Sequence, residues 1–274
     1  MIQDITKLID ALPPLPQTLI KLEEFKQKSV QEPIELLQIL EQDPLIMATL
    51  LKIANSAMFG FRNKVETTKK AIELIGVNFT LSIAFGSAIK STLNTNLDAY
   101  HISSDQFIEL SNMSSNLLSR WLSPFDMELK EQLLLPVFLQ ETGKFVLSNL
   151  AVQRGVADEF YKEISANIND IVKIEKKYFE ASSSEVTAII FEQWGLDNKL
   201  IDIIRNVDNV EKCDEKYKKA TEILAVIKVL CNPIDPLSDR AVEDGIELAK
   251  SFGLNSRYLT KAIEIMQDRI LDAM

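Results

Sequence analysis

The spacing of apolar residues is the feature of this sequence that most restricts its fold. Apolar side chains recur three and four positions apart along nearly the whole chain, and no convincing run of strict alternation interrupts them. A period near 3.6 residues puts such side chains on one face of an α-helix, whereas a half-buried strand needs a period of two. The sequence therefore predicts an all-α protein.

Capping residues predict where several of these helices begin and end. Asp43 followed by Pro44 supplies an N-cap and then the residue best suited to the first helical position. Gly76 predicts the end of one helix, and Ser182 with Glu185 forms the spacing of a capping box. From position 214 onward, three more helical segments are separated by "NPIDPLS" and "LNS". We therefore expect many short helices rather than a few long ones.

The charge of the chain argues against nucleic acid as a partner. Its 274 residues carry a formal net charge of −10, so the average surface would repel a phosphate backbone. No stripe of lysine and arginine reverses that balance locally. The length and ordinary apolar content fit one large or two small globular domains with a substantial core.

Cysteine usage and the N-terminal segment both bear on the compartment. Cys213 and Cys231 lie eighteen positions apart, without a C-x-x-C pair or a histidine neighbour, which favours structural thiols in a reducing environment. The opening "MIQDITKLID" has charges where a signal peptide needs an apolar run, and no later apolar stretch is long enough to cross a bilayer. We expect a cytoplasmic protein without membrane insertion.

A cluster of polar residues interrupts the apolar stretch "LLLPVFLQETGKFVLSNL" at positions 133–150. The interruption is Gln140, Glu141, Thr142, Gly143 and Lys144, which we call the QETGK segment. Polar groups buried without partners cost several kcal/mol. The segment is therefore a site, the remnant of a site, or a place where a helix meets solvent.

Three stretches of the sequence together resemble the HDOD family, the non-catalytic relatives of the HD phosphohydrolases. They are "LPPLPQTL", "ILEQDPLIMATLLKIANSAMFG" and "AIELIG", and the resemblance runs from about position 12 to about 207. It implies an HD-superfamily-like orthogonal bundle of helices. The family-like core would span residues 1–210, with lobes of about 1–96 and 97–210, and residues 211–274 would be a C-terminal helical extension. The residues that carry the motif, with structural roles, are Asp43, Pro44, Asn55, Ser56, Gly60, Gly76 and Gly143.

By the same resemblance, the QETGK segment lies where HD enzymes carry a His-Asp-x-Gly-Lys signature. Gln140 and Glu141 would then occupy the positions of the metal-binding His-Asp pair, while Gly143 and Lys144 keep the pattern. The remaining ligand positions would fall near Ser111, Ser183 and Asn206, none of which is a histidine. The amide of glutamine does not replace imidazole as a ligand of a transition metal. We therefore expect no metal, no cofactor and no catalytic residue.

This pattern indicates a decommissioned metal site that persists as a polar junction between helices. Glu141 is expected to pair with Lys144, three positions on, or with a hydroxyl group of Ser111 or Ser183. An alternative for Lys144 is a buried stem with its ammonium group in water.

The resemblance implies a bacterial signalling module that acts by binding other proteins, such as receiver, cyclic-dinucleotide-turnover or motility components. Two alternatives stay open. One is a sensor that keeps the old cleft for a nucleotide or another small anion, held by Lys144 and helix N-termini. The other is a phosphohydrolase that uses carboxylates alone, for which Glu141 would need a partner such as Asp202 or Asp208.

Overall fold

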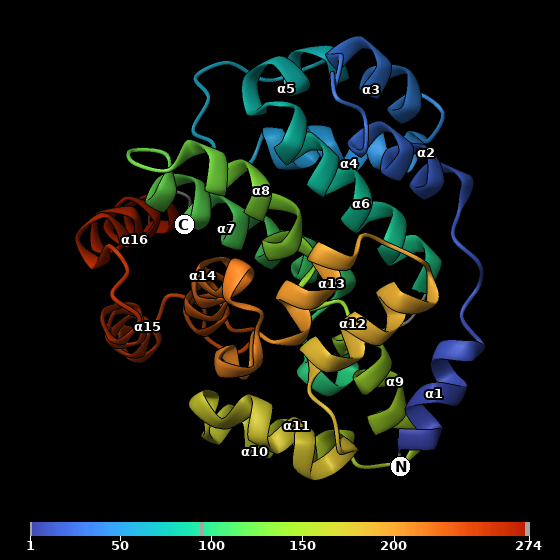
Figure 1. Ribbon diagram of the computed structural model, residues 1–274, viewed down its shortest axis with the longest axis vertical. Coiled ribbons are helices and arrows are strands. Elements are labelled where there is room, and N and C mark those ends of the chain that lie inside the picture. The colour runs from blue at the N-terminus through green and yellow to red at the C-terminus, as the bar shows by residue number, and fades with distance from the viewer. Residues whose placement is uncertain (1, 94–95, 272–274) are drawn as a thin grey trace.

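The computed structural model describes residues 2–93 and 96–271 of the chain. These residues form α-helices joined by short turns and 3-10 helices, with no β-strand among them, as Figure 1 shows. The prediction of an all-α protein is confirmed. In the same residues, no helix combines the length and the apolar character needed to cross a membrane.

The first helix of the chain packs in a different place from the five helices that follow it. Helices α2 to α5 pack around α6, whereas α1 contacts α9 and α12 in the other half of the molecule, as Figure 1 shows. The division into lobes near residue 96 stays a prediction, and α1 ties its two sides together. The helices concerned are α1 (Ile2–Asp10), α2 (Gln17–Lys26), α3 (Pro33–Leu40), α4 (Pro44–Ala54), α5 (Thr68–Ile75) and α6 (Val77–Leu93).

Helix α8 joins this first group to the helices that follow, because it packs against both α6 and α7. Every residue from Leu133 to Leu139 in α8 is buried. Helix α6 approaches α8 closely at Gly86, where an added Cβ atom would lie 2.3 Å from Cε1 of Phe138. The helices of this part are α7 (Ser104–Leu122), α8 (Met127–Leu139), α9 (Lys144–Gln153), α10 (Ala157–Ala166), α11 (Ile171–Phe179), α12 (Ser183–Gln193) and α13 (Asn198–Arg205).

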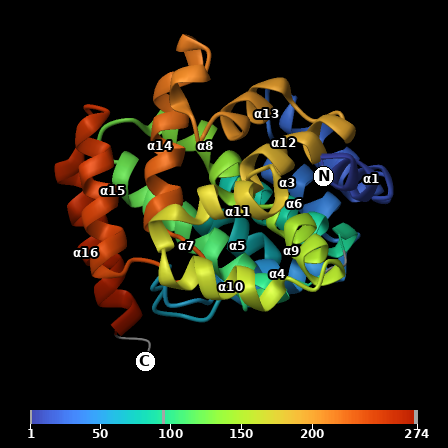
Figure 2. The same ribbon diagram turned by 90° about the horizontal axis from the view of Figure 1, so that it is seen from below.

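The C-terminal helices pack on the rest of the molecule. Helix α14 contacts α7, α8 and α13, and α16 lies along α7. The indole N–H of the buried Trp121 donates to the carbonyl of Asn255 at 2.9 Å, which fixes the turn before α16. Figure 2 shows α14, α15 and α16 side by side at one end of the molecule. These helices are α14 (Lys218–Leu230), α15 (Asp239–Ser251) and α16 (Ser256–Leu271).

Several helix ends lie where the capping residues predict them. The Asp43 carboxylate accepts hydrogen bonds from the backbone N–H groups of Leu45 and Ile46 at the start of α4. Ser182 and Glu185 form a complete capping box at the start of α12. Gly76 ends α5 with a φ of +88°, a region that disfavours residues with a Cβ atom. Local sequence chemistry therefore sets these boundaries.

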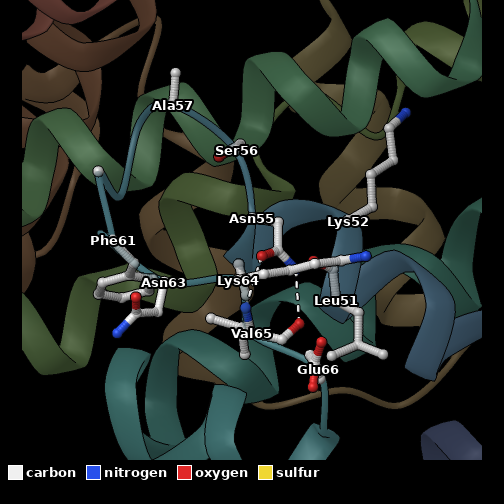
Figure 3. A pocket seen from close by; sticks show the side chains of 12 residues that line it. Leu51, Lys52, Asn55, Ser56, Ala57, Phe61, Asn63, Lys64, Val65 and Glu66 are labelled. Carbon is white, nitrogen blue, oxygen red and sulfur yellow. Dashed lines mark hydrogen bonds between the residues drawn. The ribbon is translucent and has the colours of Figure 1, made fainter.

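The segment after α4 is held by the side chain of Asn55. Its amide group donates to the carbonyls of Leu51 and Val65, and its carbonyl oxygen accepts from the N–H of Val65, each at 2.8 Å. Figure 3 shows this clasp, which closes the loop between α4 and α5. The side chain thus reaches one turn back in α4 and ten residues forward along the chain. Gly60 within the loop has a φ of +61°.

Replacing Asn55 by alanine is expected to destabilise the fold by about 1–2 kcal/mol, because both backbone groups of the buried Val65 lose their partner. Urea denaturation of the parent and of Asn55→Ala measures the effect. Asn63→Ala is the matched control, since Asn63 is exposed in the same loop. Equal stability of the three proteins would show that the clasp contributes nothing.

Candidate functional site

Close contact with α12 shapes the QETGK segment, which forms the turn between α8 and α9. A Cβ atom on Gly143 would lie 2.1 Å from the carbonyl oxygen of Ser183, so only glycine fits there. The hydroxyl group of Thr187 accepts from the N–H of Gly143 at 2.7 Å. The same hydroxyl lies 3.0 Å from the carbonyl oxygen of Gln140, to which it can donate. The turn and α12 are therefore locked together.

The ammonium group of Lys144 lies at the centre of a buried polar network. Its side chain is 1% exposed, and Nζ lies 2.7 Å from Glu141 and 2.8 Å from Glu175. It is also 3.4 Å from the hydroxyl oxygen of Ser183 and 4.7 Å from the centre of the Tyr100 ring. The ammonium group is therefore paired inside the protein, which excludes the alternative of a solvated group at the end of a buried stem.

Glu175, from α11, accepts three hydrogen bonds within this network. One carboxylate oxygen accepts from Lys144 and from the hydroxyl group of Tyr100, the latter at 2.9 Å. The other oxygen accepts from the backbone N–H of Ser183 at 2.7 Å. Because the side chain is 0% exposed, all of its partners come from the protein. It links α9, α11, α12 and the 3-10 helix Asp98–Tyr100.

A second buried lysine enters the network from the C-terminal helices. Lys228, on α14, pairs with Asp208 at 2.7 Å and lies 3.4 Å from Glu141. Its ammonium group also donates to the hydroxyl group of Ser184. Asp208 in turn accepts from the hydroxyl group of Ser182 at 2.5 Å. The predicted C-terminal extension therefore supplies a charge to the polar junction.

Charge pairing governs the ionisation of this network. Burial alone would raise the pKa of Glu141, but the ammonium groups of Lys144 and Lys228 outweigh it and lower that pKa to about 2. Burial would lower the pKa of Lys144, and the carboxylates of Glu141 and Glu175 instead raise it. The pKa of Lys228 is raised for the same reason, chiefly by Asp208. Both lysines are thus cationic and the carboxylate ionised at neutral pH.

The structure brings together only part of the residue set that the sequence suggested. Glu141, Lys144 and Ser183 are in mutual contact. Gln140 is buried, but its amide oxygen has no hydrogen-bond partner within the described residues. The amide group of Asn206 donates to the carbonyl of Asp202 at the end of α13, and Asp208 lies in the network in its place.

Ser111 is buried on α7, where its carbonyl accepts from the hydroxyl group of Ser115. Its side chain forms no hydrogen bond with the network in the described part of the chain.

Sequence reasoning missed Glu175 and Lys228. Glu175 lies four positions from both Ile171 and Phe179, on the apolar face of its helix. Lys228 interrupts the apolar run "ILAVIKVL" at positions 223–230. A charge on an apolar helical face signals burial with a partner, although it does not say which one.

The residues at this position do not fit a resident metal. Among the described residues, no group of three or more histidine, cysteine, aspartate or glutamate side chains is arranged to hold an ion. The carboxylates of Glu141, Glu175 and Asp208 face the ammonium groups of Lys144 and Lys228 instead. Their negative charge is therefore already largely balanced by the protein itself.

A cavity of about 630 Å³ opens over one side of the network. Its walls come from α11, α14, α15 and the turn after α13, and they are mostly apolar. Glu141, Lys144, Asp208 and Lys228 line its polar end. Both lysines there already contact carboxylates, so neither presents a free charge to a ligand.

Removing the central acceptor is expected to destabilise the fold strongly. Glu175→Leu leaves the hydroxyl group of Tyr100 and the backbone N–H of Ser183 without an acceptor, and takes one carboxylate from Lys144. We expect a loss of about 3–5 kcal/mol in urea denaturation. Glu73→Leu, which breaks a surface pair, should leave the midpoint nearly unchanged. A Glu175→Leu protein as stable as the parent would show that the network is dispensable.

The lowered pKa of Glu141 predicts that the free energy of unfolding falls at acidic pH. The carboxyl has a pKa of about 2 in the folded chain and ordinarily 4.5, so its ionised form stabilises the fold above about pH 5 and less as the pH falls toward 2. Between pH 7 and pH 3.5, the parent should lose about 1 kcal/mol more stability than Glu141→Gln. Denaturation curves at the two pH values test this, and parallel losses would contradict the pairing.

Comparison with solved structures shows that the fold is shared with other proteins. A virulence factor from Campylobacter jejuni is 24% identical over 98% of this chain and 100% of its own, with a TM-score of 0.57. A protein from Shewanella amazonensis, provisionally named a phosphohydrolase, is 18% identical over 97% of this chain and 95% of its own, with a TM-score of 0.66.

A third structure, from Marinobacter aquaeolei, is provisionally named a signal transduction protein. It is 17% identical, the match covers 99% of this chain and 64% of that one, and the TM-score is 0.70. At these identities the likeness establishes the fold alone. A search of curated proteins gave no match.

The sequence also matches a family model. The model of the HDOD domain covers residues 12–210, well over half of the chain. This match agrees with the stretches in which the resemblance was seen, and the structural neighbours confirm the HD-like helical fold. The chain belongs to the HDOD domain family.

Proposed function

We propose that the chain is a non-catalytic regulatory module of bacterial signal transduction that acts in the cytoplasm by binding other proteins. The observation that supports the proposal is the pairing of Glu141, Glu175 and Asp208 with two buried lysines. By the resemblance of the QETGK segment, we take this network as the counterpart of the metal site of HD enzymes. Metal-assisted attack of water on a phosphoester needs open coordination positions. Ammonium groups that are fixed between the carboxylates supply none.

Membership of the HDOD family and the likeness to a protein provisionally named for signal transduction support a regulatory role. The partners we propose are receiver, cyclic-dinucleotide-turnover or motility proteins. Phosphohydrolysis, as the name of the Shewanella amazonensis protein suggests for that protein, is the competing function.

A second candidate function is a small-molecule sensor, because the cavity over the network has the volume of a ligand site. The charges argue against the anion that the sequence suggested. Three carboxylates and two ammonium groups leave the network with one net negative charge, so phosphate is not favoured there. A ligand of this cavity would be neutral or cationic.

The purified chain is expected to hydrolyse neither a phosphodiester such as bis-p-nitrophenyl phosphate nor a cyclic dinucleotide, with Mn²⁺ added. Restoring part of the signature with Gln140→His and Glu141→Asp should also give no activity, because Ser111, Ser183 and Asn206 still withhold the other ligands. Hydrolysis assays and elemental analysis test both proteins. Activity of the parent that disappears in Glu141→Ala would overturn the non-catalytic assignment.

A further inference from the structure

A groove of about 560 Å³ lies between α5, α7, α8 and α16, away from the buried network. Figure 1 shows α7 and α8 between α5 and α16, and the loop after α4 completes the wall. We call it the α5–α16 groove. It joins segments from the N-terminal helices, the HD-like part and the C-terminal helix, so a molecule bound there would contact all three.

The floor and rim of the groove are apolar. Phe59 stacks on Phe61 with ring centres 5.5 Å apart and meets Phe79 edge to face at 5.3 Å. At the rim, Leu74 is 41% exposed and Tyr258 is 37% exposed. Apolar side chains gathered in this way around a concave surface are typical of interaction sites.

The charged residues of the groove are all cationic. Arg120, Lys130 and Lys261 line it, and no aspartate or glutamate is part of the lining. Lys130 pairs with the neighbouring Glu131, whereas Lys261 has no ion pair within the described part of the chain. The chain has a net charge of −10, so this local excess of positive charge is opposite in sign to the charge of the average surface.

Arg120 lies in the groove without a carboxylate partner in the described part of the chain. One guanidinium nitrogen donates to the carbonyl of Met58 at 2.9 Å, and Arg269 donates to the same carbonyl. The Nε atom of Arg120 is buried without a partner in residues 2–93 and 96–271. Two guanidinium groups thus converge on one neutral oxygen, and neither has a carboxylate partner in those residues. This arrangement favours an incoming carboxylate.

We propose that the α5–α16 groove docks an acidic segment of a partner protein. Carboxylates of that segment would face Arg120, Lys130 and Lys261, and an aliphatic or aromatic side chain would lie against the phenylalanines of the floor. The inference rests on the proposed function, and it names the surface through which the chain would bind other proteins. Positive charge around an apolar groove complements a segment with the opposite pattern of charge.

The apolar rim favours a polypeptide over a nucleotide as the occupant. Phe125, 42% exposed, packs against Tyr258 with ring centres 5.3 Å apart and carries the apolar surface beyond the groove itself. A single nucleotide in the groove would leave that surface in water, whereas a helix or extended segment can cover it. A second copy of this chain carries the same cationic groove and the same net charge, so it offers no general electrostatic attraction.

Selection from a random 12-residue peptide library displayed on phage, with the full chain as the target, tests the proposal. We expect enriched peptides that combine aspartate or glutamate with leucine or an aromatic residue. Fluorescence polarisation should show at least about tenfold weaker binding of these peptides to Lys261→Glu and to Leu74→Ser. The matched controls are Lys250→Glu on α15 and Leu45→Ser on α4, which change exposed residues elsewhere and should alter affinity less than about twofold.

Three outcomes would overturn the proposal. The first is no enrichment, or enriched peptides whose affinity is the same for Lys261→Glu and Lys250→Glu. The second is a rise in melting temperature with ATP that is lost in Lys261→Glu, which would assign the groove to a nucleotide. The third is a dimer of the parent in size-exclusion chromatography that is lost in the same variant, which would assign it to a second copy.

Different results would count against the groove and against the proposed function. A partner protein that binds the parent and Lys261→Glu equally well would show that the groove is not the docking site. The proposal that the chain binds other proteins would still stand. Phosphodiesterase activity of the parent would instead contradict the non-catalytic assignment, whether or not the selected peptides bind in the groove.

Discussion

The buried ammonium group of Lys144 is the contact on which the rest of this structure depends. A charge with 1% exposure is tolerated only where acceptors surround it. Those acceptors come from the turn before α9, from α11 and from the start of α12. Apolar packing does not by itself specify which polar groups meet. Pairing of this one ammonium group requires Glu175 and Ser183 to reach it from different helices, which restricts how those helices pack.

Lys228 extends the same constraint to the C-terminal helices. Its pairing with Asp208 and its proximity to Glu141 join α14 to the turn after α13 and to the QETGK segment. Two ammonium groups thus hold the carboxylates of this network, and one of them lies beyond residue 210. Helix α14 is therefore joined to the polar network through Lys228.

The sequence was informative wherever the physics is local. The apolar period identified the helices, and Asp43, Gly76 and Ser182 marked ends that the structure reproduces. Glu141 and Lys144 are three residues apart in the sequence, so their contact could be expected from helical spacing. Partners remote in sequence could not be found in this way. Glu175 and Lys228 show only as charges on apolar faces, and nothing local says that they share one network.

Helix α8 relates the two polar regions of the molecule to each other. Lys130 in its first turns lines the α5–α16 groove, and Gln140 caps its other end at the start of the QETGK segment. That end is closely packed, because Gly143 lies against the backbone of Ser183 and Thr187 contacts both Gly143 and Gln140. A partner that displaced α8 would therefore have to break these contacts together. Since closely packed contacts of this kind have few intermediate arrangements, we expect α8 to respond to a bound partner by moving as a rigid helix or by a discrete repacking of the network.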